Sequence, residues 1–303
     1  MTVAISFLIG AALVGQFAPG FLARLVVGGA DPLATLVAWL ASAIAVVLTT
    51  AAGVVVLLLP DHGLTALHAC WSLIQHGTTP RIEAVGGIAG TSMVIALAYR
   101  LVATTLHTVR RRARARAEHL ETLRIAARRD GSTLWLAREE PLAFSLAGKP
   151  GVIVATEGLT EHLSQAQLNA VFAHERAHLT GRHHLLVAFA DALAHALPFV
   201  PLFKLSPAVL RELVELAADS AAARACGPDA VRAALIKVSQ HGVPTTALGM
   251  SGSSIDLRLA RLRTGRCPAG RARQLLTCTF AGATALALPA GAVLSAIALT
   301  CLA

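Results

Sequence analysis

One short segment of the chain carries residues that are typical of metal-dependent hydrolysis. It reads His174-Glu175-Arg176-Ala177-His178, with two histidines four positions apart. On a helix, residues at this spacing lie on the same face, so both imidazoles can reach one ion. Neutral imidazole nitrogens are zinc ligands, and a neighbouring glutamate can accept a proton from water that the metal makes acidic. The H-E-x-x-H pattern therefore predicts a site for one zinc ion per chain, with Glu175 as catalytic general base and acid.

A catalytic zinc ion needs a third protein ligand and one open position, and two residues compete for that role. Glu215 stands in the later segment Glu215-Leu216-Ala217-Ala218-Asp219. His184 completes the string H-E-x-x-H-x-x-G-x-x-H, which is typical of metzincins, but those enzymes also need a methionine turn, and only Met250 follows the motif. We expect Glu215 to be the third ligand and His184 to be the less favoured alternative. Asp219, one helical turn after Glu215, should accept the spare N–H of a ligand imidazole.

The residues around the motif predict a small α+β domain that positions it. Ser164 and Gln167 have the spacing of a capping box, so a helix should begin at Ser164 and end near Gly181. His183 and His184 are then expected to be surface residues at a helix end. Short apolar runs upstream predict strands, the last two forming a hairpin, at 134–136, 142–146 and 152–155. Further helices are predicted downstream at 207–225 and 229–240.

The composition excludes an ordinary soluble enzyme and an intrinsically disordered chain. Of the 303 residues, 55% are hydrophobic and 14% are charged, whereas an average soluble domain has roughly 25% charged residues. One globule of this size cannot bury so much apolar surface. Crossing a bilayer takes about 20 apolar residues, and four stretches are long enough: 1–23, 32–60, 84–109 and 275–303. A further apolar stretch, 185–203, is interrupted by polar residues and prolines, so we expect a buried or membrane-surface helix there.

The arginines set the expected orientation of these spans, since the net charge is +9. They gather directly after the third span and directly before the fourth: Arg110, Arg111, Arg112, Arg114 and Arg116, then Arg258, Arg261, Arg263, Arg266, Arg271 and Arg273. Cytoplasmic loops carry an excess of Lys and Arg, so we expect the segment between the clusters in the cytoplasm and both termini outside. The clusters should attract anionic lipids. No stacking aromatics accompany them, so no direct nucleic-acid binding is expected.

The predicted architecture is a mainly α polytopic membrane protein with about four transmembrane helices and an inserted small α+β zincin domain. Residues 1–109 should hold three spans, residues 110–273 the cytoplasmic metallopeptidase domain, and residues 274–303 the fourth span. Within the inserted domain, 110–129 is predicted to be an arginine-rich juxtamembrane helix, and 242–254 is predicted to be a loop.

Several of these segments together resemble the gluzincin core of membrane metallopeptidases. The similarity covers roughly residues 135–240, and the matching pieces are 143–145, 152–159, 163–164, 171–178 and 215–219. Two related families share this core: the Ste24/HtpX-like peptidases and the BlaR/MecR-type peptidases of the β-lactam response. The resemblance implies a zinc metalloendopeptidase of the cell membrane. It also implies that the substrate peptide adds as a strand to a sheet edge above the metal, which is expected at the hairpin 142–155.

The expected topology favours the BlaR/MecR type. HtpX-like proteins place two membrane helices between the histidine motif and the third-ligand glutamate, and the stretch 185–203 is too short to cross twice. The BlaR/MecR sensors continue into an external penicillin-binding domain, and this chain ends at Ala303. The resemblance implies regulatory proteolysis of a protein such as a BlaI-like transcriptional repressor. Two alternatives stay open: an HtpX-like quality-control peptidase, and a non-catalytic membrane scaffold with a structural zinc site.

Overall fold

The computed structural model describes residues 2–58, 127–148, 150–240 and 252–264, with shorter pieces between 92 and 118 and between 275 and 283. The expected span 84–109 is described only in helical pieces from residue 92 onward, and nearly all of the expected span 275–303 lies outside the described residues. So does Met250, and the proposed division of the chain at 109 and 273 therefore stays a prediction.

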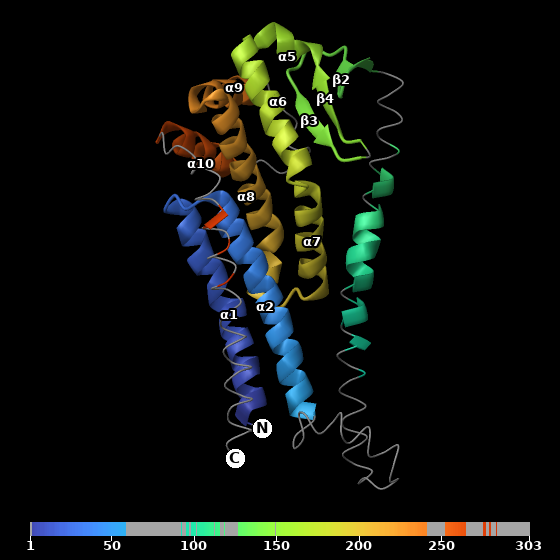
Figure 1. The fold of residues 1–303 in the computed structure, drawn as a ribbon, viewed down its shortest axis with the longest axis vertical. Coiled ribbons are helices and arrows are strands. Elements are labelled where there is room, and N and C mark those ends of the chain that lie inside the picture. The colour runs from blue at the N-terminus through green and yellow to red at the C-terminus, as the bar shows by residue number, and fades with distance from the viewer. Residues whose placement is uncertain are drawn as a thin grey trace.

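Two long apolar helices begin the chain and run side by side (Figure 1). They are α1 (Thr2–Val27) and α2 (Pro32–Leu58). Each has a segment long and apolar enough to cross a membrane, 20 residues over Phe7–Val26 and 23 residues over Pro32–Val54. The Asp31 carboxylate accepts the backbone N–H of Leu33 at 2.8 Å and so begins the second helix. The first two expected spans are therefore helical and fit a bilayer by length and composition.

A four-stranded sheet lies at the far end of the molecule from the N-terminus (Figure 1). Its strands are β1 (Arg128–Asp130), β2 (Thr133–Leu136), β3 (Ala143–Leu146) and β4 (Val152–Thr156), in the order β1-β2-β4-β3. β2 pairs with β4 in parallel, and the outer pairs are antiparallel. The predicted hairpin is confirmed as β3 and β4. The prediction of helix up to residue 129 is wrong at its end, because Gly131, at φ +58°, turns the chain so that 128–130 pairs with β2.

The remaining described helices follow the sheet: α5 (Glu157–His162), α6 (Gln165–Thr180), α7 (His183–Ala196), α8 (Pro201–Cys226), α9 (Pro228–Gln240) and α10 (Gly252–Arg263). The predicted helices at 164–181, 207–225 and 229–240 are confirmed as α6, α8 and α9, although α8 begins six residues earlier than expected. Its first turn accommodates Pro201, which needs no N–H partner there.

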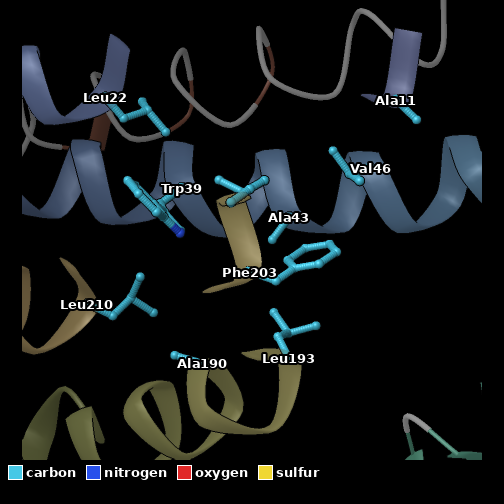
Figure 2. Packing of buried hydrophobic residues seen from close by; sticks show 10 residues of the cluster. Ala11, Leu22, Trp39, Ala43, Val46, Ala190, Leu193, Phe203 and Leu210 are labelled. Atoms are coloured by element: carbon cyan, nitrogen blue, oxygen red, sulfur yellow. The ribbon is translucent and has the colours of Figure 1, made fainter. Parts of the chain in front are cut away.

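The apolar stretch 185–203 is not a single helix, because it contains most of α7, a turn and the first three residues of α8. α7 runs down from α6, the chain turns at 197–200, and α8 returns alongside α7 and against α1 and α2 (Figure 1). α7 and α8 pack on α1 and α2 through a buried cluster that includes Trp39, Ala43, Leu193 and Phe203 (Figure 2). The expectation of a buried segment is therefore confirmed, and its burial is against α1 and α2.

Candidate metal centre

The helix α6 carries the H-E-x-x-H residues, and contacts at its first turn and with the sheet hold it in place. Its capping box is formed as predicted, since the Ser164 hydroxyl accepts the N–H of Gln167 and the Gln167 side chain accepts the N–H of Ser164. On the sheet side, Phe172 of this helix packs edge-on against Trp135 of β2, with ring centroids 5.9 Å apart. These contacts fix the height and rotation of the helix that carries both histidines.

The second element of the centre is the upper half of α8, which lies against α6. Its neighbouring side chains Leu213, Val214 and Leu216 are buried in a cluster with residues of α1, α2 and α7. The glutamate at 215 points away from that cluster and toward α6, where it meets both histidines. The fold therefore brings together the three residues that the sequence analysis selected as ligands.

Three side chains converge in a geometry that suits zinc. His174 Nε2 and His178 Nε2 are 3.1 Å apart, and they lie 3.4 and 3.3 Å from the two carboxylate oxygens of Glu215. Tetrahedral zinc with bonds of about 2.0–2.1 Å holds its ligand atoms about 3.3 Å apart. Among the described residues, these three form a group able to hold a metal ion, and His184 does not belong to it. The donor set and its spacing therefore fit the ion that the motif predicts.

Each histidine of this group has a partner at its other ring nitrogen. His174 Nδ1 lies 3.0 Å from Asp219 Oδ1, as predicted for the residue behind a metal ligand. His178 Nδ1 lies 2.9 Å from the Nδ1 of His183. Both contacts leave the Nε2 atoms directed toward Glu215. A proton held at Nδ1 of each ligand ring would keep the Nε2 lone pair free for a metal.

The expectation that His183 is a surface residue is wrong, because only 5% of it is exposed. An unusual turn places it beside His178. Arg182 adopts a left-handed conformation, with φ +48° and ψ +38°, and the chain enters α7 at the next residue. A Cβ atom on Gly181 would lie 2.4 Å from His183 Nε2, so a glycine is needed for this ring position. A left-handed non-glycine residue next to a site is a signal of functional constraint that sequence reasoning alone could not detect.

Arg258 of α10 closes the centre from the side opposite α6. Its guanidinium donates to both oxygens of Asp219, at 2.6 and 2.8 Å, and lies 3.1 Å from Glu215. From the sequence, this arginine is expected in a basic cluster at the membrane, but its side chain is only 7% exposed. Arg261 of the same helix donates to the backbone oxygens of Val26 and Ala30 at the end of α1. For these two arginines, the expected contact with lipid headgroups is therefore replaced by contacts within the protein.

The positive and negative groups of the centre stabilise one another in their ionised forms. Burial opposes ionisation of Glu215 and Asp219, but hydrogen bonds from the histidines and the charge of Arg258 outweigh it and hold the pKa of each carboxyl below its usual value. Burial likewise opposes a charged His174, yet its bonds to both carboxylates raise its pKa to about 10. Burial and the neighbouring His178 lower the pKa of His183 to about 4, so this ring is neutral and can accept a hydrogen bond.

Glu175 has a different environment from the other acids of the centre. It is half-buried on α6, and burial raises the pKa of its carboxyl above the usual value, opposed by the histidines and by a hydrogen bond from Ser145. Ser145 belongs to β3, the outer strand of the sheet. A carboxyl whose pKa is displaced toward neutrality is suited to proton transfer. The contact with Ser145 also brings the expected substrate edge next to this residue.

Parts of this chain are similar to one protein family and to one curated protein. Residues 110–211 match peptidase family M48, a range that contains the H-E-x-x-H segment and ends before Glu215. A stretch of 64 residues is 38% identical to a protein described as "Protease HtpX homolog" from Aquifex aeolicus (strain VF5). This stretch covers 20% of the chain and 21% of that protein, so the match spans about a fifth of the length of the relative. No solved structure matches the chain. The likenesses support a membrane metallopeptidase, and neither singles out the BlaR/MecR type.

Proposed function

We propose that this chain is a membrane-anchored zinc endopeptidase. The observation that carries the proposal is the convergence of His174 Nε2, His178 Nε2 and the Glu215 carboxylate at separations of 3.1–3.4 Å. Glu175 follows the first ligand on the same helix and is chemically suited to move a proton. Three ligands leave one tetrahedral position for water or substrate, as catalytic zinc sites require.

The residues of the chain would share the work of hydrolysis. Bound zinc supplies a Lewis acid that polarises the scissile carbonyl and makes water acidic at neutral pH. Glu175 would accept the proton of the attacking water and then deliver it to the nitrogen of the leaving amine. Asp219 and His183 would hold the ligand rings in the tautomer that binds through Nε2. Arg258 would keep Glu215 and Asp219 ionised in the metal-free protein.

The outer strand β3 is the proposed binding edge for an extended peptide. One side of β3 pairs with β4, and the sheet order leaves the other side at the edge. Such an edge offers backbone N–H and C=O groups to an incoming strand. Because Ser145 on this strand contacts Glu175, a peptide added here would run past the proton-transfer residue. This arrangement supports cleavage within a chain.

The proposal also covers the membrane topology of the chain and its role in the cell. We place residues 110–273 in the cytoplasm between three preceding spans and a fourth, with the remaining basic residues near anionic lipids. The BlaR/MecR resemblance supports regulatory cleavage of a protein such as a BlaI-like repressor. Quality control of membrane proteins, in the manner of HtpX, is the rival role for the same chemistry.

The test compares the wild-type protein with Glu175→Gln, purified in detergent and loaded with zinc. We expect the wild type to cleave an unfolded protein such as casein, and Glu175→Gln to bind zinc but lose cleavage. Equal cleavage by both variants would exclude the proposed proton-transfer role. Loss of zinc by Glu175→Gln would instead indicate a misassembled site, and Glu175→Ala should then repeat the comparison.

The same pair of variants, expressed in cells, separates the two biological roles. Accumulation of one regulator in the inactive variant supports signalling, whereas accumulation of many damaged membrane proteins supports quality control. Absence of any difference between the proteomes, with zinc bound in both, would favour a scaffold over an enzyme.

A further inference from the structure

The hairpin of α7 and α8 lies beside α1 and α2. Its side-chain contacts show which parts of these two helices its two ends reach. At its upper end, Val187 and Leu213 share a buried cluster with Val26 and Leu36. The last two residues stand at the end of α1 and near the beginning of α2, where the apolar segments Phe7–Val26 and Pro32–Val54 end and begin. In a membrane, the upper end of the hairpin would therefore lie near the bilayer surface.

The tip of the hairpin reaches much further along the same helices. A Cβ atom on Gly15 of α1 would lie 3.0 Å from Val200 Cγ1, so the tip approaches the α1 backbone closely. Gly15 is about 16 Å from Val26 along α1, at about 1.5 Å per residue. On α2, Val46 belongs to the cluster with Phe203 (Figure 2) and lies about 15 Å from Leu36 by the same rise. Both helices place the tip about halfway through a hydrocarbon layer of about 30 Å.

Several polar groups that face the interior of the hairpin have partners, as a location in lipid requires. The turn contains Pro198 and Pro201, which have no N–H to satisfy. Ser206 donates to the backbone oxygen of Leu202 and accepts the indole N–H of Trp39 at 2.7 Å. Between the two helices, Arg211 donates to both carboxylate oxygens of Asp191 at 2.9 and 3.1 Å.

The outer surface of the tip is apolar. Phe199 in the turn is 77% exposed, and Leu205 on the first turns of α8 is 45% exposed. The exposed large residues of α1 are of the same kind, with Phe17 at 67%. Large apolar side chains exposed on both α1 and the hairpin tip favour contact with lipid rather than water.

Two exposed polar residues of the hairpin flank its turn, one two residues before it and one four residues after it. They are His195, whose Nδ1 bonds to the backbone oxygen of Asp191, and Lys204. Lys204 precedes Arg211 by seven residues and Glu215 by eleven, so these three lie on one stripe of α8. The stripe leads up to the metal centre, and a long lysine side chain can extend along it toward water.

We propose that the α7–α8 hairpin is a re-entrant membrane element. It enters the bilayer from the side of the metal centre, turns at 197–200 among the acyl chains near mid-depth, and returns to the same side. The proposal rests on the membrane placement of α1 and α2 made above. It deepens the proposed function, because Glu215 follows Leu213 by two residues and the metal centre then stands at the membrane surface. Its substrates would be peptide segments that lie at that surface.

The test measures the depth of a spin label in vesicles of phosphatidylcholine and phosphatidylglycerol. In a variant without its five native cysteines, the label is attached separately to Phe199→Cys, Phe17→Cys and Glu161→Cys. Residue 17 reports the lipid-facing side of α1, and residue 161 is an exposed position on α5. Collision with oxygen, which concentrates in lipid, is compared with collision with a water-soluble nickel chelate. Zinc content confirms that each labelled protein retains its metal centre.

We expect the oxygen-to-nickel collision ratio at 199 to match that at 17 and to lie far above that at 161. A nickel-accessible label at 199 together with a protected label at 17 would overturn the re-entrant hairpin and leave the zinc peptidase intact. Nickel access at both 17 and 199 would overturn the membrane anchor and the hairpin together. Nickel access at 199 only from the opposite side of the membrane would show a complete crossing and would also contradict the proposal.

Discussion

The two halves of α8 are held in opposite ways. The half before residue 214 buries apolar side chains such as Phe203 against α1 and α2. The half after it carries Glu215 and Asp219, which bond to histidines and to Arg258. Apolar packing is non-directional and can relax around a change, whereas a buried charge that loses its partner has no alternative. One helix thus joins a half that packs on α1 and α2 to a half that carries candidate metal ligands.

The largest effect on stability is expected when the charged half loses its cation. Arg258→Leu leaves the buried carboxylate of Asp219 and the partly buried carboxylate of Glu215 without their guanidinium. We expect the free energy of unfolding of the metal-free protein to fall by about 3–5 kcal/mol. Denaturant unfolding in detergent measures it.

Arg263→Leu is the matched control, since Arg263 is exposed on the same helix. It should change the free energy of unfolding by no more than about 0.5 kcal/mol. Zinc should reduce the loss in Arg258→Leu, because the ion then compensates Glu215. Equal stability of the two arginine variants would show that the charged half is not held by Arg258.

In the apolar half of α8, Phe203→Ala should lower the free energy of unfolding somewhat less than Arg258→Leu does. Phe203 is 1% exposed and sits between α2 and α7, so its removal leaves a cavity. We expect a loss of about 3 kcal/mol in the free energy of unfolding. In Phe199→Ala, where the ring is exposed, the loss in detergent should be minor. Similar losses for both phenylalanines would contradict the packing that Figure 2 shows.

The smallest expected effect is on zinc affinity, and it tests the hydrogen-bond partner of His178. Replacing His183 by Leu removes the acceptor from His178 Nδ1, and zinc affinity should fall by about 10–100-fold. His183→Asn should restore most of that affinity, because its amide oxygen can take the place of the ring Nδ1. His184→Leu is the control and should leave affinity unchanged. Competition with a zinc chelator gives these affinities, and an equal loss from both leucine variants would exclude the positioning role.

The metal ligands could be predicted from the sequence because their chemistry is local. The spacing of His174 and His178 on one helix fixes their common face, and the pair Glu215 and Asp219 repeats that logic on a second helix. The hairpin 142–155 was likewise predictable from short apolar runs, separated by a segment that contains Gly148, Pro150 and Gly151.

The rest of the centre depends on long-range or irregular backbone geometry. His183 reaches the site through a left-handed residue at 182, which no residue pattern announces. Arg258 comes from a helix beyond residues 241–251, and its place in an arginine cluster favoured a membrane-surface interpretation. Pro198 and Pro201 signalled a break in the stretch 185–203, but only its packing on α1 and α2 showed a hairpin.

The zinc content of purified variants tests the central claim most directly. The account predicts one zinc ion per chain in the wild type, in Glu175→Gln and in His184→Ala, and loss of zinc in His174→Ala and Glu215→Ala. Elemental analysis after dialysis against a weak chelator gives the count. A wild type without zinc, or Glu215→Ala that keeps zinc while His184→Ala loses it, would contradict the account.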